Sequence, residues 1–175
     1  MPLTMEKILI IGCSGGGKST LARKIGDILS LPVIHLDIHF WKSGWIESTD
    51  EEWIPKVKEL IKQDKWVMDG NFGETIPIRV EAADTVIFLD TSRTLQLWGV
   101  FTRVLKFYGK TRPDLPEGCP ERFDWAFTKW VWQYNKNNRP KILNFLTNYK
   151  DSKNIIILKN RKEMNEFVKG LYNNP

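Results

Sequence analysis

Short apolar runs alternate with amphipathic stretches along this chain. Five of the runs are continuously apolar, as is typical of parallel strands that are covered on both faces. They span Lys7 to Ile11, Val33 to Leu36, Trp66 to Met68, Thr85 to Leu89 and Ile155 to Leu158. Segments with helical spacing separate them, so the pattern predicts an α/β fold in which helices pack on a parallel sheet.

Two of the helical segments carry clear signals. Residues 21–29 and 53–61 each place apolar side chains on one helix face. Thr49 precedes Glu52 by three positions, a capping-box spacing that predicts where the second of these helices begins. The same signal at Asn160 predicts the start of the last helix.

The regular spacing breaks once, between residues 89 and 155. Three helices are predicted in this interval, at Leu95 to Tyr108, Asp124 to Tyr134 and Pro140 to Tyr149. The segment from Gly109 to Arg122 lies between the first two and is rich in Gly, Pro and charge. Loops longer than about 12 residues without structure of their own are often lids. We predict a mobile lid region at about 104–124 with few apolar anchors; the alternative is a solvated connector.

The segment from Gly12 to Ser19 matches the phosphate-binding pattern G-x-x-x-x-G-K-[ST]. A predicted strand precedes it and a predicted helix follows, which is the context that the pattern requires; the alternative is a plain Gly-rich turn. Glycines let backbone N–H groups approach a phosphate closely, and the helix N-terminus favours an anion. Lys18 would reach the β- and γ-phosphates, and the Ser19 hydroxyl would ligate Mg²⁺. The candidate phosphate-binding residues are Gly12, Gly15, Gly16, Gly17, Lys18, Ser19 and Thr20.

Three aspartates directly follow predicted strands. Ligands of open parallel sheets bind beyond the carboxyl ends of the strands, where a carboxylate can hold a metal-bound water or accept a proton. We predict such roles for Asp37 and Asp69, with a turn or cap role as the alternative. Asp90 precedes a helix that is expected to begin near Ser92, so capping is favoured there.

Two further groups of side chains can each be interpreted as a binding site or as ordinary packing. His35, Asp37 and His39 alternate and could bind a metal together, but a core His35 and a surface His39 are simpler. Several aromatic residues near the predicted lid favour core and lid packing over stacking on nucleic-acid bases. They are Trp125, Phe127, Trp130 and Trp132.

Composition narrows the class of protein. A chain of 175 residues, 42% hydrophobic and 27% charged, predicts one globular domain and excludes collagen-like, coiled-coil and largely disordered proteins. No apolar run approaches the roughly 18 residues of a membrane span, and no export signal is recognisable. We therefore expect a cytoplasmic protein in which Cys13 and Cys119 are reduced thiols.

Charge is distributed unevenly along the chain. The net charge is +5, yet residues 1–90 carry more acidic than basic side chains and residues 91–175 carry 16 basic and 7 acidic ones. A basic C-terminal half predicts an anionic partner. Nucleotide phosphates and nucleic acid both satisfy this expectation.

Several motifs together resemble the small bacterial P-loop proteins labelled DNA topology modulation (FlaR-related) proteins. They are the phosphate loop, His35-Leu36-Asp37 with Trp41 and Gly44-Trp45, Met68-Asp69-Gly70-Asn71-Phe72, Val86 to Asp90, Gly109 to Asp114, and Glu117-Gly118-Cys119-Pro120. That family is similar to the adenylate kinase and shikimate kinase branch of P-loop proteins. The resemblance implies a three-layer P-loop NTPase fold, with a five-stranded parallel sheet between helices, a helical lid insertion, and ATP as phosphoryl donor.

The resemblance also implies residue roles. Asp69-Gly70 is similar to the Asp-Gly of adenylate kinases, in which the Asp helps to hold Mg²⁺, but Asn71-Phe72-Gly73 departs from the sequence that follows there. Asp37 is similar to the strand-end Asp of shikimate kinases. In position, Arg103, Arg112 and Arg139 resemble the lid arginines of that branch. Arg161 follows the last predicted strand, where that branch has its adenine-binding loop.

We therefore expect an ATP-binding, Mg²⁺-dependent kinase that acts on an unidentified small acceptor. Lys18, Arg112 and Arg139 would stabilise the transferred group, and Asp37 would be the acceptor-side base. Two alternatives remain: a nucleic-acid-associated regulator that uses ATP as a switch or not at all, and a lid-gated ATPase without an acceptor. The sequence leaves the oligomeric state open.

Overall fold

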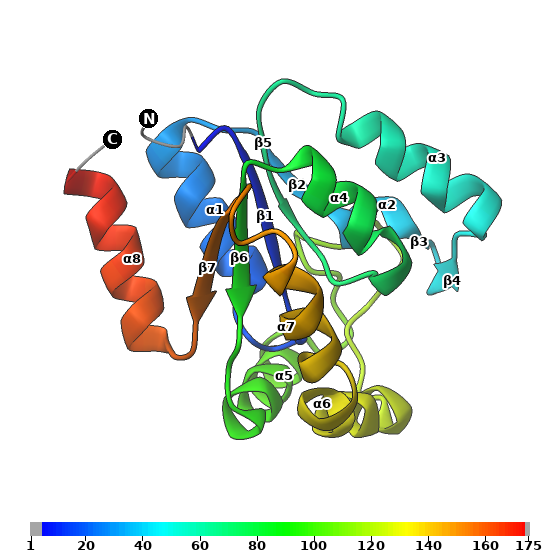
Figure 1. Cartoon of the computed structure of the whole chain (residues 1–175). Helices are drawn as coiled ribbons and strands as arrows, with labels where there is room; N and C mark the ends of the chain where they lie inside the picture. Colours follow the sequence, from blue (N-terminus) through cyan, green and yellow to red (C-terminus); the bar gives the residue numbers. More distant parts are fainter. Residues whose placement is uncertain (1–4, 174–175) are drawn as a thin grey trace.

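The computed structural model describes residues 5–173 and forms three layers around one parallel sheet (Figure 1). The sheet has the strand order β2-β5-β1-β6-β7, and all neighbours are parallel. Its strands are β1 (Lys7–Gly12), β2 (Val33–His35), β5 (Trp66–Asp69), β6 (Thr85–Leu89) and β7 (Asn154–Leu158). The five predicted strands and their parallel arrangement are thus confirmed.

Helices cover both faces of this sheet. One face packs on α1 (Lys18–Leu29) and α8 (Arg161–Asn173), through side chains such as Ile25 and Val168. The other face packs on α3 (Asp50–Leu60), α4 (Ile76–Ala82) and α7 (Arg139–Thr147). The continuously apolar strands follow from this arrangement, because both faces of β1 and β6 are buried.

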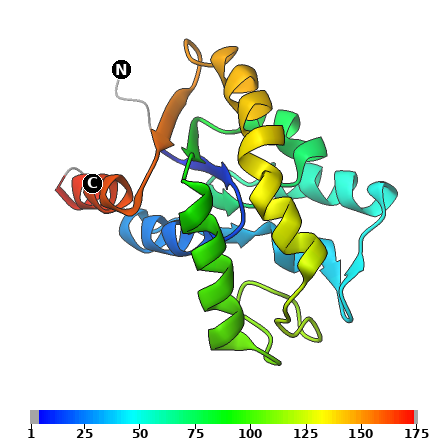
Figure 2. The same ribbon diagram turned by 90° about the horizontal axis from the view of Figure 1, so that it is seen from below.

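Two longer helices stand at the carboxyl ends of the strands. They are α5 (Arg93–Phe107) and α6 (Trp125–Asn137), which cross beneath the sheet edge (Figure 2). The loop between them lies beside a small antiparallel hairpin of β3 (Trp41–Lys42) and β4 (Ile46–Glu47). This part of the chain is the predicted insertion, and it surrounds the end of the sheet at which ligands of such folds bind.

The sequence pattern does not predict several of the short elements. The apolar run at Val33 to Leu36 ends one residue early as a strand, because α2 (Leu36–Phe40) begins directly after β2. The η1 turn (Gly73–Thr75), α4 and the β3–β4 hairpin are likewise too short to show a period. The capping box of Thr49 and Glu52 at the start of α3 is present as predicted.

The lid loop has two buried apolar anchors. Leu115 and Cys119 are buried, and the thiol of Cys119 donates to the carbonyl oxygen of Lys42 at 3.2 Å. The Gly118 carbonyl oxygen accepts from the Gly44 N–H at 2.8 Å. The loop is therefore docked on the β3–β4 hairpin, a partner that only tertiary structure brings to it.

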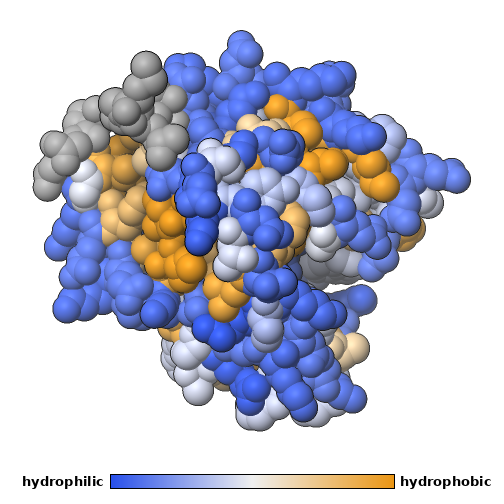
Figure 3. Space-filling model, viewed as in Figure 1, coloured by the Kyte–Doolittle hydropathy of each residue, from blue (hydrophilic) through white to orange (hydrophobic). Residues whose placement is uncertain are grey.

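The aromatic residues near the lid also differ from expectation. Trp125 and Trp132 are exposed, and Trp130 lies at the edge of the cavity described below rather than in the core. Arg93 lies over the ring of Trp132, 4.5 Å from its centroid. Elsewhere, apolar side chains gather at the surface over β7, the edge strand, whose Ile157 is exposed (Figure 3).

Within residues 5–173, no helix has the length and apolar character needed to cross a membrane. Both cysteines are free and buried, in agreement with the expected thiols. Burial raises the pKa of the Cys13 thiol to about 12, so this group stays protonated beside the phosphate loop.

Candidate functional site

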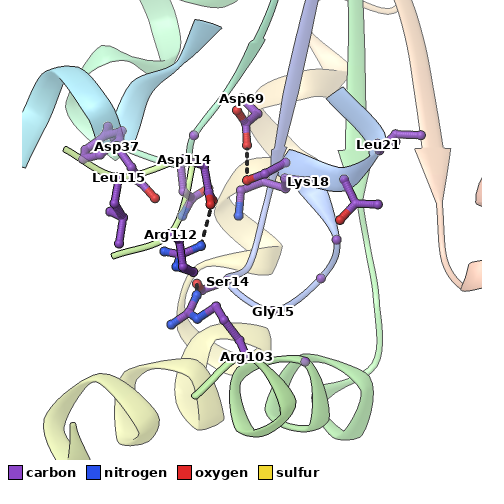
Figure 4. A pocket seen from close by; sticks show the side chains of 18 of the residues that line it. Ser14, Gly15, Lys18, Leu21, Asp37, Asp69, Arg103, Arg112, Asp114 and Leu115 are labelled. Carbon is purple, nitrogen blue, oxygen red and sulfur yellow. Dashed lines mark hydrogen bonds and ion pairs between the residues drawn. The ribbon is translucent and has the colours of Figure 1, made fainter. Parts of the chain in front are cut away.

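A cavity of about 1640 Å³ opens at the carboxyl ends of the strands (Figure 4). Its lining includes residues of the phosphate loop, α2, the end of β5, α5, the lid loop and α6. Segments far apart in the sequence therefore meet at one place, as expected for an open parallel sheet.

The phosphate loop connects β1 to α1 in a conformation that only glycine accommodates easily. Gly15 and Gly17 have φ values of 76° and 102°. A Cβ atom on Gly15 would lie 2.1 Å from the carbonyl oxygen of Gln96, so α5 packs directly against the loop. Gly17 is the N-cap of α1, and no side chain caps that helix. The unpaired N–H groups of its first turn therefore face the cavity, where an anion can bind them.

Lys18 begins α1 and folds back across the loop. Its Nζ atom donates to the carbonyl oxygen of Cys13 at 3.1 Å. Desolvation lowers the pKa of Lys18, while the negative charges of Asp69 and Asp37 act in the opposite direction. An incoming phosphate would supply the counter-charge that this buried ammonium lacks.

The next residue, Ser19, contacts the end of β5. Its hydroxyl donates to Oδ2 of Asp69 at 2.7 Å, and the other carboxylate oxygen, Oδ1, accepts from Nδ1 of His35 at 2.5 Å. Burial lowers the pKa of His35, but the hydrogen bond and charge of Asp69 outweigh it and raise the pKa. His35 is thus the partner of Asp69 rather than an isolated core residue. Among residues 5–173 no group of three or more His, Cys, Asp or Glu can hold a metal, so the alternating His35, Asp37, His39 cluster does not form one.

Two arginines from the insertion face the phosphate loop. Nη1 of Arg103 on α5 donates to Oγ of Ser14 at 3.1 Å, and Nη1 of Arg112 in the lid loop donates to Oδ2 of Asp114 at 2.7 Å (Figure 4). Nε of each arginine lies near the same atom, Oε2 of Glu121, at 3.2 Å from Arg103 and 2.7 Å from Arg112. The Glu121 side chain is only 3% exposed, so this network is held away from water. The sequence pattern did not identify Asp114 and Glu121 as site residues, because their roles depend on arginines that only the folded chain brings to them.

Asp37 lies in the first turn of α2 and lines the cavity. No hydrogen bond or ion pair of its carboxylate is present in the described part of the chain. Desolvation raises the pKa of Asp37, and the nearby charge of Lys18 opposes that rise.

The structure does not bring Arg139 to this cavity. Its guanidinium makes a two-pronged ion pair with Asp90, with Nη2 donating to Oδ2 at 2.8 Å. The expectations for both residues are therefore corrected. Ser92, rather than Asp90, caps α5 by accepting from the Leu95 N–H, and Arg139 is not positioned to contact the transferred phosphate. Arg161 does line the cavity, at the start of α8.

Arg79 is a third residue that the sequence pattern did not reveal. It is completely buried on α4, and burial lowers the pKa of its guanidinium to about 9. Its donors reach the carbonyl oxygens of Gly70, Asn71 and Phe72. Arg79 therefore shapes the loop after β5, which forms one wall of the cavity.

No protein-family model matches this chain, and no curated protein matches its sequence. Solved structures do match its fold. A gluconokinase from Sinorhizobium meliloti 1021 has a TM-score of 0.55 and 15% identity, over 97% of this chain and 90% of that one. A shikimate kinase from Acinetobacter baumannii in complex with shikimate has the same TM-score and identity, over 97% and 92%. A shikimate kinase from Bacteroides thetaiotaomicron has a TM-score of 0.53 and 15% identity, over 97% and 98%. The architecture of this chain is thus the three-layer α/β fold of P-loop kinases.

Proposed function

We propose that this chain is a phosphotransferase that moves the γ-phosphoryl group of ATP to a hydroxyl group of a small acceptor. One observation carries the proposal: Lys18, the Ser19–Asp69 pair and Arg103 all face one cavity from three different elements. Cations that point at a phosphate loop favour a kinase over a nucleic-acid-associated regulator, whose basic face would be directed elsewhere. The fold neighbours named above, which are kinases, support the same conclusion.

In this proposal the phosphates of ATP bind to the backbone N–H groups of residues 12–20 at the N-terminus of α1. Lys18 releases the Cys13 carbonyl and pairs with the β- and γ-phosphates. Arg161, which follows β7, lies near the adenine end. These residues hold the donor in place while the acceptor is positioned opposite.

The donor atoms near Lys18 fit Mg²⁺. Ser19 offers a hydroxyl oxygen and Asp69 a carboxylate, and Mg²⁺ prefers a few such oxygen ligands together with substrate phosphates and water. Ser19 would be a direct ligand and Asp69 would hold a metal-bound water. When bound, Mg²⁺ neutralises charge that develops on the phosphate oxygens.

Asp37 would act as the acceptor-side base, because its half-buried carboxylate lines the cavity and has no partner within the described chain. Arg103 and Arg112 would stabilise charge on the transferred group. Closure of the lid loop over the phosphates would exclude water and protect the phosphoryl group from hydrolysis.

We also propose membership in the FlaR-related family. In support, Nε1 of Trp45 donates to the carbonyl oxygen of Pro120 at 3.0 Å, so two motifs of that resemblance pack together.

The first test is calorimetric titration of ATP with Mg²⁺ into wild-type protein, Lys18→Ala and Arg139→Ala. We expect Lys18→Ala to lose at least about tenfold in affinity, since it removes a charge-assisted contact to phosphate. Arg139→Ala, whose side chain is tied to Asp90 outside the cavity, should bind as the wild type does. Equal ATP affinity in wild type and Lys18→Ala would refute the proposed phosphate site.

A further inference from the structure

The end of the cavity beyond Lys18 contains few free positive charges. We call this region the acceptor end and define it by residues that line the cavity around Asp37: Asp37, Phe40, Trp41, Trp45, Phe72, Arg112 and Leu115. The single arginine among them is engaged, because Arg112 pairs with both Asp114 and Glu121 at 2.7 Å. Its side chain is 10% exposed, so these pairs are little weakened by water.

The other buried arginine near this region is also engaged. Arg79 donates all of its hydrogen bonds to Thr75 and to the backbone of the loop after β5. The loop lines the cavity, and the guanidinium does not. Apart from Lys18 and Arg103 at the phosphate loop, the other cations that line the cavity are all exposed, where solvent screens their charge: Arg23, Lys24, Lys106, Arg122, Lys141 and Arg161. The deep part of the acceptor end therefore offers an incoming anion no uncommitted cation.

Asp37 makes the balance negative. Its carboxylate has no hydrogen-bond partner in the described chain, and its side chain lines the cavity, as that of Leu115 does (Figure 4). An acceptor that carried its own carboxylate or phosphate into this space would place two like charges together, which is unfavourable. An acceptor hydroxyl would instead donate the hydrogen bond that Asp37 lacks.

Aromatic side chains also line the acceptor end. Phe40 lies one helical turn after Asp37 on α2, and its ring centroid is 4.6 Å from that of Phe72. Trp41 packs edge-on against Phe40 at 5.1 Å and against Trp45 at 5.3 Å. Such a lining suits a planar or apolar ring, which can stack or pack edge-on against it.

From these observations we infer that the acceptor is an uncharged, hydroxyl-bearing ring compound of the nucleoside type, rather than a carboxylate or a phosphate monoester. The inference rests on the proposed function. In the transfer, the acceptor oxygen forms a bond to the γ-phosphorus and the bond from that phosphorus to the β-bridging oxygen breaks. The hydroxyl proton passes to Asp37, and the electron pair of the broken bond leaves with ADP.

Matched pairs of acceptors test this inference. Shikimate and its methyl ester differ chiefly in one anionic group. A nucleoside and its 3′-monophosphate also differ in one anionic group, and both keep the 5′-hydroxyl free. Each is titrated into protein saturated with a non-hydrolysable ATP analogue and Mg²⁺, and is then assayed for ADP release with ATP. We expect the uncharged member to bind at least about tenfold more tightly, because like charges repel in a site of low polarity. Tighter binding of the anionic member would overturn the inference.

The charge of Asp37 provides the second measurement. Asp37→Asn removes the negative charge with little change in shape, and we expect it to reduce the preference for the uncharged member by about tenfold. Asp64→Asn is the matched control, because it makes the same change of charge at an exposed residue outside the cavity and should leave the preference intact. An unchanged preference in Asp37→Asn would also overturn the inference. Failure to bind the ATP analogue contradicts the proposed function instead, so the two failures are distinguishable.

Discussion

Ser19 and Asp69 are joined by a hydrogen bond of 2.7 Å, although 50 positions separate them in the sequence. The bond connects the first turn of α1 to the end of β5. His35 holds the second oxygen of the same carboxylate from the neighbouring strand. Three elements thus fix the orientation of one carboxylate directly behind the phosphate loop, which is the arrangement that a residue supporting a metal ion requires.

Asp69→Asn should therefore weaken the binding of Mg²⁺-ATP more than the binding of metal-free ATP. The amide keeps the size of the side chain but cannot accept through both atoms, and loss of such a supporting group typically costs about 10- to 100-fold in metal affinity. Calorimetry with ATP in the presence of Mg²⁺ and of a chelator measures the two affinities. Equal weakening under both conditions would show that Asp69 supports the loop rather than the metal.

Asp37 should control the acid side of the pH–activity profile. It must be ionised to accept a proton, and burial raises its pKa above the usual 3.8, so turnover should fall as the pH drops through this raised pKa. The acid limb of kcat should disappear in Asp37→Asn together with most of the activity. A profile with the same acid limb in the variant would assign that limb to another group.

The same shift predicts an effect on stability. Because the pKa of Asp37 is higher in the folded than in the unfolded state, its ionised form opposes folding above that pKa, and the penalty is absent below the unfolded pKa. Asp37→Asn should raise the melting temperature at pH 7 by about 2–4 °C, with the gain vanishing in acid. A lower melting temperature in the variant at pH 7 would mean that the carboxylate has a stabilising partner.

Glu121 should be essential for holding the two arginines of the insertion. Glu121→Gln would leave Arg103 and Arg112 close together without their shared counter-charge, and breaking such a buried pair costs about 3 kcal/mol of folding free energy. Turnover should fall more than ATP affinity, because these cations act on charge in the transition state. Urea unfolding and steady-state kinetics measure both effects. Glu117→Gln, an exposed residue of the same loop, is the control and should change neither.

Hydrogen exchange over residues 109–122 tests the lid. The anchors at Leu115 and Cys119 predict partial protection without nucleotide, in contrast to a loop that lies free in water. A non-hydrolysable ATP analogue should slow exchange further, since the phosphates attract Arg112 and draw the loop over them. Exchange that stays unchanged at saturating analogue would retire the lid assignment and the catalytic role of Arg112.

Features that depend on neighbours in the sequence could be predicted from the sequence alone. The five buried strands follow from runs of apolar residues, and the start of α3 from a capping spacing of three positions. The phosphate loop belongs to the same class, because its glycines and the helix that follows are contiguous. Such features require no knowledge of the rest of the chain, since strand burial, capping and loop conformation are local or nearly local effects.

Tertiary structure alone decided which partner each charged side chain found. Asp90 stands beside a helix start, yet it pairs with Arg139 from 49 positions away and leaves the cap to Ser92. Arg112 meets Glu121, whereas Asp37 meets no partner in the described chain. A charge near the end of a strand interacts with whatever the topology brings within a few ångströms, and in a buried site that distance sets the energy. The sequence therefore determined the fold and the phosphate loop, whereas the folded arrangement determined which cations remain free to act.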